Sequence, residues 1–312
     1  MIRHLHPTDS AGLLPFRQAA GRAEACTLAG AIHGGPSSFP AVRYTGIALS
    51  PRAWQSCWVQ TRRTRIQVLL RAGPRSGPLA WEIRDLYLRR NFVPECWDVL
   101  EQLSVPAGRA GARRLFVRLF EGSPLFEQAR QAGYMTVNSE TVYRTASAAA
   151  ALKRLAVTGT PLELRSREKH DTDALFRLYC ASTPLNVRQR VGQTVGEWSS
   201  AIERPWRKAN EWVLDHGEGR LDAWLQTADT SAGRYFDVMC SRDAADDLQS
   251  LVAAALSEAG DGPAVTMVAA HNRALAALLE DIGFVPVRSY EVMVRMLAVR
   301  VAETRGAVAA IG

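Results

Sequence analysis

The sequence has few cysteines and no long apolar run, and both absences narrow the class of protein. No stretch of 18 apolar residues is present, so no membrane-spanning helix is expected. The opening residues, MIRHLHPTDS, lack the apolar run of a secretory signal. No CxxC pair occurs, which argues against a zinc site or disulfide framework and favours reduced thiols. The five scattered cysteines are Cys26, Cys57, Cys96, Cys180 and Cys240. We therefore expect a cytoplasmic protein with no membrane partner and no metal.

Several common catalytic and nucleotide-binding motifs are also missing. The chain contains no GxGxxG or GxxxxGK[ST] loop, no HExxH pair and no GxSxG elbow. Dinucleotide binding, nucleoside triphosphate hydrolysis, zinc proteolysis and serine hydrolysis thus have no sequence support.

Lysine is absent from the first 150 residues, whose 19 arginines and 10 acidic residues give a charge of +9. The rest of the chain has 19 basic and 21 acidic residues, a charge of −2. A basic half can bind nucleic acid or an anionic cofactor. However, aromatic residues do not alternate with the arginines as a single-strand platform requires. A solvated basic face is the simpler interpretation, and a nucleic-acid partner stays as the alternative.

One pattern of residues occurs twice in the sequence, 150 residues apart. Residues 115–134 read LFVRLFEGSPLFEQARQAGY, and residues 265–284 read VTMVAAHNRALAALLEDIGF. Each is an apolar strand, an amphipathic helix and a Gly-aromatic pair, and another strand follows. The glycine is expected to end the helix in a left-handed conformation. The aromatic residue is expected to close that helix onto a sheet.

The similarity extends upstream and predicts two related α/β domains. Each copy reads as a strand, helices, a hairpin, a strand, a helix and then the repeated pattern. This order predicts a mixed, mostly antiparallel sheet flanked by helices in each domain. An Ala-rich segment that ends in Thr-Gly-Thr-Pro separates the copies. We predict an N-terminal domain over 1–145, a linker over 146–161 and a C-terminal domain over 162–312, each domain folding as its own module.

This order of elements, with ten residues between Asn272 and the pair Gly283-Phe284, resembles the GNAT acetyltransferase superfamily in tandem form. The resemblance implies transfer of an acyl group from acetyl-CoA or another acyl-CoA to an amine acceptor. The acceptor is expected to be a small molecule or a peptide. The resemblance also places Asn272 at the acyl-CoA site.

The phosphate-binding loop implied by the resemblance is altered in both copies. That loop reads [QR]-x-x-G-x-[GA] in the family, because glycines let main-chain N–H groups approach the pyrophosphate at a helix N-terminus. In the second copy Arg242 stands at its start, but no glycine follows and acidic residues fill the next turn. In the first copy Arg89, Arg90 and Asn91 precede the helix and can bind phosphate oxygens with their side chains. The charge therefore favours the first copy as the acyl-CoA site.

The catalytic groups implied by the resemblance are also reduced. Many family members use a tyrosine seven residues after the asparagine as the acid, but Leu279 and Ala129 occupy those positions. An amine acceptor also needs a base.

Candidate bases lie on the strand before the helix. They are Asp237 in the second copy and Glu82 or Asp85 in the first, and His271 is the best-placed imidazole. An ion pair for Asp237 and a structural hydrogen bond for His271 are the alternatives.

Three functions follow from these observations. The first is a GNAT-type N-acyltransferase that uses acyl-CoA. The second is a binding or scaffold protein that keeps the fold without catalysis, because both phosphate loops and both tyrosines are lost. The third is an aminoacyl transferase that takes its acyl group from charged RNA, which the basic first half favours.

Overall fold

The two halves of the chain repeat one order of elements, as the sequence predicts. The computed structural model describes residues 2–35, 37–50, 53–63, 65–155, 162–217, 219–241 and 247–298. The first half contains β1 (Arg3–His4), η1 (Pro7–Asp9), α1 (Ser10–Ala19), α2 (Leu28–Ile32), α3 (Ala41–Ala48), η2 (Trp54–Ser56), β2 (Cys57–Arg62), β3 (Arg65–Pro74), β4 (Ala80–Leu88), η3 (Arg90–Glu95), α4 (Cys96–Gln102), α5 (Ser104–Arg109), β5 (Arg114–Phe120), α6 (Phe126–Gln131) and β6 (Met135–Thr145).

The second half begins with the short helix α7. Its elements are α7 (Ala148–Arg154), β7 (Leu164–Ser166), η4 (Lys169–Asp171), α8 (Thr172–Ser182), α9 (Leu185–Val191), α10 (Val195–Ala201), β8 (Asn210–Asp215), β9 (Leu221–Thr230), β10 (Gly233–Cys240), α11 (Asp247–Ala259), β11 (Ala264–Ala269), α12 (Arg273–Asp281) and β12 (Val285–Met296).

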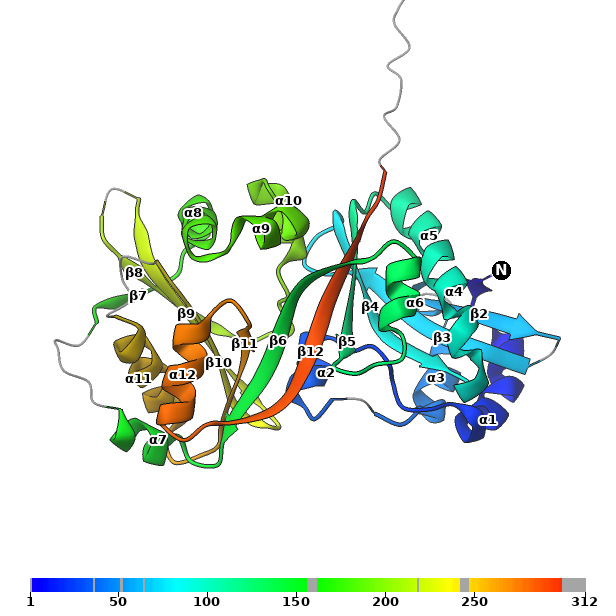
Figure 1. Ribbon diagram of the computed structural model, residues 1–312, viewed down its shortest axis with the longest axis horizontal. Helices are drawn as coiled ribbons and strands as arrows, with labels where there is room; N and C mark the ends of the chain where they lie inside the picture. Colours follow the sequence, from blue (N-terminus) through cyan, green and yellow to red (C-terminus); the bar gives the residue numbers. More distant parts are fainter. Residues whose placement is uncertain are drawn as a thin grey trace, which may run out of the picture.

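All the named strands join in one twelve-stranded sheet with helices on both faces (Figure 1). The strand order is β1-β2-β3-β4-β5-β12-β6-β11-β10-β9-β8-β7. The pairs β4–β5 and β10–β11 are parallel, and the other pairs are antiparallel. The predicted mixed, mostly antiparallel α/β architecture is confirmed.

The last strand of each half is exchanged with the other half. Strand β12 pairs with β5 of the first half, from Tyr290 opposite Phe120 to Met296 opposite Arg114. Strand β6 pairs with β11 of the second half, from Thr145 opposite Ala264 to Glu140 opposite Ala269. The two exchanged strands also pair with each other at the centre (Figure 1). The two halves thus share their central strands.

The strand exchange predicts that neither half folds alone. Residues 1–145 expressed without the second half would leave β5 without its neighbour β12 and β6 without β11. Such unpaired strand edges favour aggregation. We expect the isolated half to aggregate or remain unfolded, and the two halves to be soluble when co-expressed, as judged by size-exclusion chromatography and circular dichroism. A monomeric first half that melts cooperatively would contradict the exchange.

Each half nevertheless has its own main core. Helices α4, α5 and α6 cover one face of β3–β5, and α1 and α3 cover the other face of β2–β4. In the second half α7, α11 and α12 pack on β9–β11 around Phe236 and Leu251. Helix α7 lies inside the predicted linker, where Ala148 and Ala151 are buried in this second core. Residues 156–161 of that linker lie outside the described residues.

The two Gly-aromatic pairs end their helices as the sequence predicts. Gly133 and Gly283 have φ values of 81° and 93°, a region that only glycine adopts without strain. The next residue in each copy donates its main-chain N–H back into the helix, from Tyr134 to Ala129 and from Phe284 to Leu279. Both aromatic residues are buried, which closes each helix onto the sheet.

Candidate functional site

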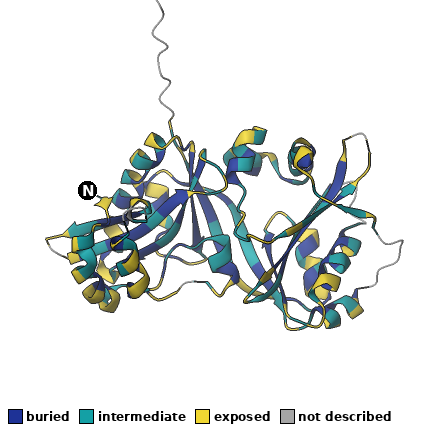
Figure 2. Ribbon diagram, turned by 180° about the vertical axis from the view of Figure 1, so that it is seen from behind, coloured by how far each residue is buried: buried dark blue, intermediate teal, exposed yellow. Residues whose placement is uncertain are grey.

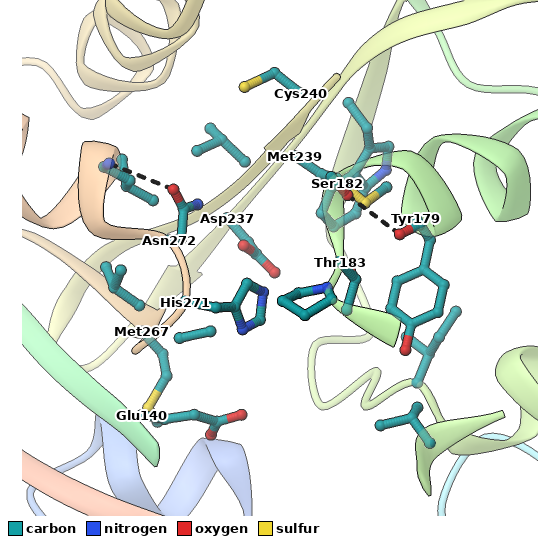
Figure 3. Close-up of a pocket in the computed structure, with 18 of the residues that line it drawn as sticks. Glu140, Tyr179, Ser182, Thr183, Asp237, Met239, Cys240, Met267, His271 and Asn272 are labelled. Atoms are coloured by element: carbon teal, nitrogen blue, oxygen red, sulfur yellow. Dashed lines mark hydrogen bonds between the residues drawn. The ribbon is translucent and has the colours of Figure 1, made fainter. Parts of the chain in front are cut away.

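A cavity opens where the parallel strands β10 and β11 separate. Their ladder contains only the pairs Arg234–Ala264 and Tyr235–Val265, after which the strands diverge. The resulting cavity has a volume of about 600 Å³ and is bordered by β10, β11, the start of α12 and the segment from α8 to α10. Figure 3 shows side chains from these elements facing the same space.

The first half has a corresponding wedge, which is the space between its diverging parallel strands β4 and β5. A segment of the same half fills this wedge. Strands β4 and β5 pair from Ala80 to Ile83 and then diverge. Beyond that point the backbone of Ala25 bridges Leu86 on one strand and Leu119 on the other. Its neighbours Glu24 and Cys26 donate N–H groups to Leu86 O and Arg118 O, at 2.8 and 3.1 Å. Ala25 is buried in the first core, so this segment closes the wedge.

The predicted phosphate ligands of the first half lie beside this closed wedge. The Arg89 Nε donates a hydrogen bond to Ile66 O at 2.9 Å, so this guanidinium is already engaged. Arg90 and Asn91 are exposed in the first turn of η3. Their role in binding phosphate stays a prediction, and the geometry does not favour the first half as the acyl-CoA site.

The two alternative bases of the first half are held in ion pairs. Asp85 lies 2.7 Å from Arg71 Nε and accepts a hydrogen bond from the Tyr44 hydroxyl at 3.0 Å. Glu82 lies 3.3 Å from Arg75 Nε. Both carboxylates are therefore already engaged, although burial and the charge of Glu203 raise the pKa of the Glu82 carboxyl against the opposing charge of Arg75.

Asp237 lies in the open cavity of the second half, half-buried on β10 (Figure 3). It forms no ion pair with any residue that the structure describes, so the predicted structural alternative finds no support. Burial raises the pKa of the Asp237 carboxyl to about 7, the charge of Glu140 adds to this, and a hydrogen bond from the Val238 backbone opposes it. A carboxylate with a pKa near neutrality is suited to accept a proton.

His271 lies beside Asp237 in the cavity (Figure 3). Its Nδ1 is 3.4 Å from Asn138 Oδ1 on β6, a long contact that orients the ring. Partial burial lowers the pKa of the imidazole, and the charge of Glu140 opposes this effect only in part. The ring is therefore neutral at pH 7 and can accept or relay a proton.

Asn272 caps the helix that points its N-terminus into the cavity. Its Oδ1 accepts a hydrogen bond from Leu275 N at 3.4 Å, and the residue also lines the cavity. The first-turn N–H groups of α12 therefore lie near the space that a ligand would occupy. Arg242, the predicted phosphate ligand of this half, lies outside the described residues.

A buried ion-pair network, not predicted from the sequence, forms the floor of the cavity. Arg118 of β5 donates to Glu140 Oε2 of β6 at 2.9 Å and to Glu203 Oε1 at 2.6 Å. Glu203 follows α10 in the second half and also lies 3.4 Å from Arg75 Nη2. Although burial raises the pKa of Glu203, the charges of Arg118 and Arg75 outweigh that effect and hold it at about 2. The exchanged strands thus bring residues of the first half into a site of the second.

Two tyrosines of the cavity wall were also missed by the sequence interpretation. Tyr235 precedes Asp237 by one strand period and is only 1% exposed, and its hydroxyl makes no hydrogen bond with the described residues. The hydroxyl of Tyr179, on α8, is buried and has no hydrogen-bond partner among the same residues. No periodic sequence pattern distinguishes these residues from ordinary core aromatics.

Among the described residues, no group of three or more His, Cys, Asp or Glu side chains is arranged to hold a metal ion. In the same part of the chain, no helix has the length and apolar character needed to cross a membrane.

No family model and no curated protein matches this sequence. Solved structures match it in fold. A functionally unknown conserved protein from Staphylococcus epidermidis aligns with a TM-score of 0.52 at 11% identity, over 71% of this chain and 88% of its own.

Two other solved structures carry the GNAT name. A tandem GNAT protein from the clavulanic acid biosynthesis pathway aligns with a TM-score of 0.49 at 14% identity, over 95% of this chain and 98% of its own. A GCN5-related N-acetyltransferase from Sphaerobacter thermophilus aligns with a TM-score of 0.49 at 15% identity, over 95% of each chain. Fold alone does not fix function, so the chemistry of the cavity must carry that assignment.

Proposed function

We propose that this protein is an N-acyltransferase that takes an acyl group from acyl-CoA and works through the cavity of its second half. The observation that carries the proposal is Asp237, a carboxylate with a pKa of about 7 that pairs with no cation of the described residues, in the open wedge between β10 and β11. The opposite wedge is closed by residues 24–26.

The open wedge suits the extended arm of an acyl-CoA. Beyond Tyr235 and Val265 the facing edges of β10 and β11 have no ladder partners. An extended ligand with amide groups can hydrogen-bond to such strand edges as an added strand does. Arg242, which follows β10 in the sequence, is the basic candidate for the phosphates, although the acidic residues that follow it oppose this role. When bound, acyl-CoA supplies the activated acyl group.

The residues of the cavity supply proton transfer and orientation. Asp237, charged above pH 7, takes the proton from the ammonium of the acceptor and leaves a neutral nitrogen able to attack. His271, held by Asn138, lies next to it and relays the proton toward solvent. The Tyr179 hydroxyl, which has no hydrogen-bond partner among the described residues, donates a proton to the thiolate as the carbon–sulfur bond breaks. The proton that the acylated nitrogen then loses restores this hydroxyl, a role that Leu279 cannot perform.

Binding without turnover is the second candidate function. Leu279 and Ala129, at the two family tyrosine positions, are both fully buried in their cores. A binding protein would take up acyl-CoA in the same wedge but release no free CoA when an amine is added.

The proposed function predicts that CoA and acetyl-CoA stabilise the protein and shield Cys240. At 100 times the dissociation constant, a ligand adds about 2.7 kcal/mol to the free energy of unfolding, which thermal-shift titration detects. Cys240 is partly buried at the cavity wall, whereas the partly buried Cys180 does not line the cavity and serves as the internal control. Alkylation followed by peptide mass spectrometry should show that CoA protects Cys240 alone.

Two results would contradict this proposal. No thermal shift at millimolar CoA would remove the acyl-CoA assignment. Protection of Cys26, which lies in the segment that closes the first wedge, without protection of Cys240 would place the ligand in the other half.

A further inference from the structure

The cavity contains polar groups that no residue of the described chain satisfies. Glu140 uses Oε2 for both of its bonds with Arg118, and its Oε1 accepts no hydrogen bond from the described residues. Tyr235 keeps a free hydroxyl although its side chain is only 1% exposed. Asp237 is a carboxylate without a counter-ion. The Glu140 side chain is 20% exposed, and all three residues line the cavity, so together they present polar groups that a ligand can bind.

The charge around these groups favours a cation. The network that borders the cavity is balanced, because Arg75, Arg84 and Arg118 face Glu82, Glu140 and Glu203. Asp237 then adds one negative charge that no described residue neutralises.

The other ionisable groups that line the cavity do not cancel this charge. His271 is neutral at pH 7 because its pKa is lowered, and Arg273 is exposed at the first residue of α12. A bound anion would therefore meet uncompensated repulsion, whereas an ammonium group would meet two carboxylates.

The shape of the wall supports the same ligand. Trp198, Trp224 and Tyr179 line the cavity together with Met239 and Met267. Aromatic faces attract cations and also pack against methylene groups. A chain of methylenes that carries more than one ammonium group matches this combination of rings and separated carboxylates.

We propose that the acceptor is an aliphatic diamine or polyamine, with one nitrogen acylated beside Asp237 and a second, charged nitrogen bound by Glu140 Oε1. The proposal rests on the function proposed above, because it names the substrate class of that site. Asp237 comes from the second half and Glu140 from β6 of the first, and Figure 3 shows both carboxylates facing the same space with His271 between them. The strand exchange therefore creates the acceptor site.

The test compares acceptors of matched length with acetyl-CoA as the donor. The acceptors are 1,4-diaminobutane, butylamine, 4-aminobutan-1-ol and 4-aminobutanoate. A series of diamines with three to six carbons then finds the best distance between the two nitrogens. We expect kcat/KM for the best diamine to exceed that for its matched monoamine by about 10- to 100-fold. The aminobutanoate should be the poorest acceptor.

The variant Glu140→Gln tests which residue binds the second nitrogen. It should abolish the preference for diamines, measured within the variant as the ratio of kcat/KM for the diamine to kcat/KM for butylamine, while the thermal shift with CoA is retained. Glu140→Asp should restore part of the preference. Glu127→Gln is the matched control, because Glu127 is 70% exposed on α6 and pairs only with Arg130. Equal kcat/KM for diamine and monoamine, or an unchanged preference in Glu140→Gln, would overturn the proposal.

Calorimetric titration of the diamine without acyl-CoA separates this proposal from the proposed function. Diamine binding that depends on Glu140, with no turnover, would support the cation site and contradict acyl transfer. Acylation of monoamines and diamines at equal rates would support acyl transfer and contradict the cation site.

Discussion

Replacing Asp237 with asparagine is expected to lower kcat/KM for acyl transfer by about 10²- to 10³-fold, the usual contribution of a general base. In the wild type, kcat/KM should rise with pH through about 7 and then level off, because the Asp237 carboxyl must be ionised and its pKa is about 7. The variant Asp237→Asn should lose that inflection. Steady-state rates between pH 5.5 and 9 measure both effects.

The same substitution should change the pH dependence of stability. The pKa of Asp237 is raised from 3.8 to about 7, so the folded state holds this proton more tightly than the unfolded state does. Its contribution to stability is full below pH 3.8 and is lost as the pH rises through 7. The free energy of unfolding of Asp237→Asn, relative to the wild type, should therefore increase by about 2–3 kcal/mol between pH 5 and pH 8.

Asp229→Asn is the control for both measurements. Asp229 is 85% exposed on β9 and pairs with Arg234 at the surface. Its replacement should leave the rate profile and the pH dependence of unfolding unchanged. Full activity in Asp237→Asn, or an inflection near pH 7 that persists in this variant, would contradict the role of Asp237 as base.

The second large effect concerns the ion-pair network. Replacing Arg118 with methionine is expected to lower the free energy of unfolding by about 3–5 kcal/mol, because it leaves carboxylates buried without their partner. Arg118 is 3% exposed and binds Glu140 and Glu203 at once. Urea denaturation at pH 7.5 measures the loss.

Arg130→Met is the matched control for this prediction. Arg130 is 61% exposed and pairs with Glu127 within one helix, where such a pair contributes about 0.3–0.5 kcal/mol. The destabilisation of Arg118→Met should also diminish as the pH falls toward 2, because the pKa of Glu203 is held at about 2 in the wild type and its protonation removes the ion pair. Equal stabilities for the two variants would show that the network does not hold the halves together.

The sequence predicted what depends on local pattern. Gly133 and Gly283 end their helices because the left-handed conformation is a property of the residue itself. The aromatic residues that follow, Tyr134 and Phe284, are buried and close those helices onto the sheet, as the same pattern predicts. Both features are determined within one or two turns of chain, so a single sequence contains enough information for them.

The sequence did not predict the features that depend on distant partners. An apolar strand such as β12 pairs equally well with several neighbours, so its residues did not reveal that it crosses to β5. The segment around Ala25 gave no sign that it fills a wedge formed by Leu86 and Leu119. Glu140 and Glu203 carry no sequence pattern that marks them as site residues, because their partner Arg118 lies on another element. The positive charge of the first half therefore favoured that half as the acyl-CoA site, although its wedge is closed in the structure.

The most direct test is a crystal structure of the protein grown with CoA. We predict that the pantetheine arm of CoA lies between β10 and β11, with its thiol in the cavity bordered by Asp237, His271 and Glu140. CoA between β4 and β5, with residues 24–26 displaced, would contradict it, and so would crystals grown in millimolar CoA that contain no ligand in either wedge.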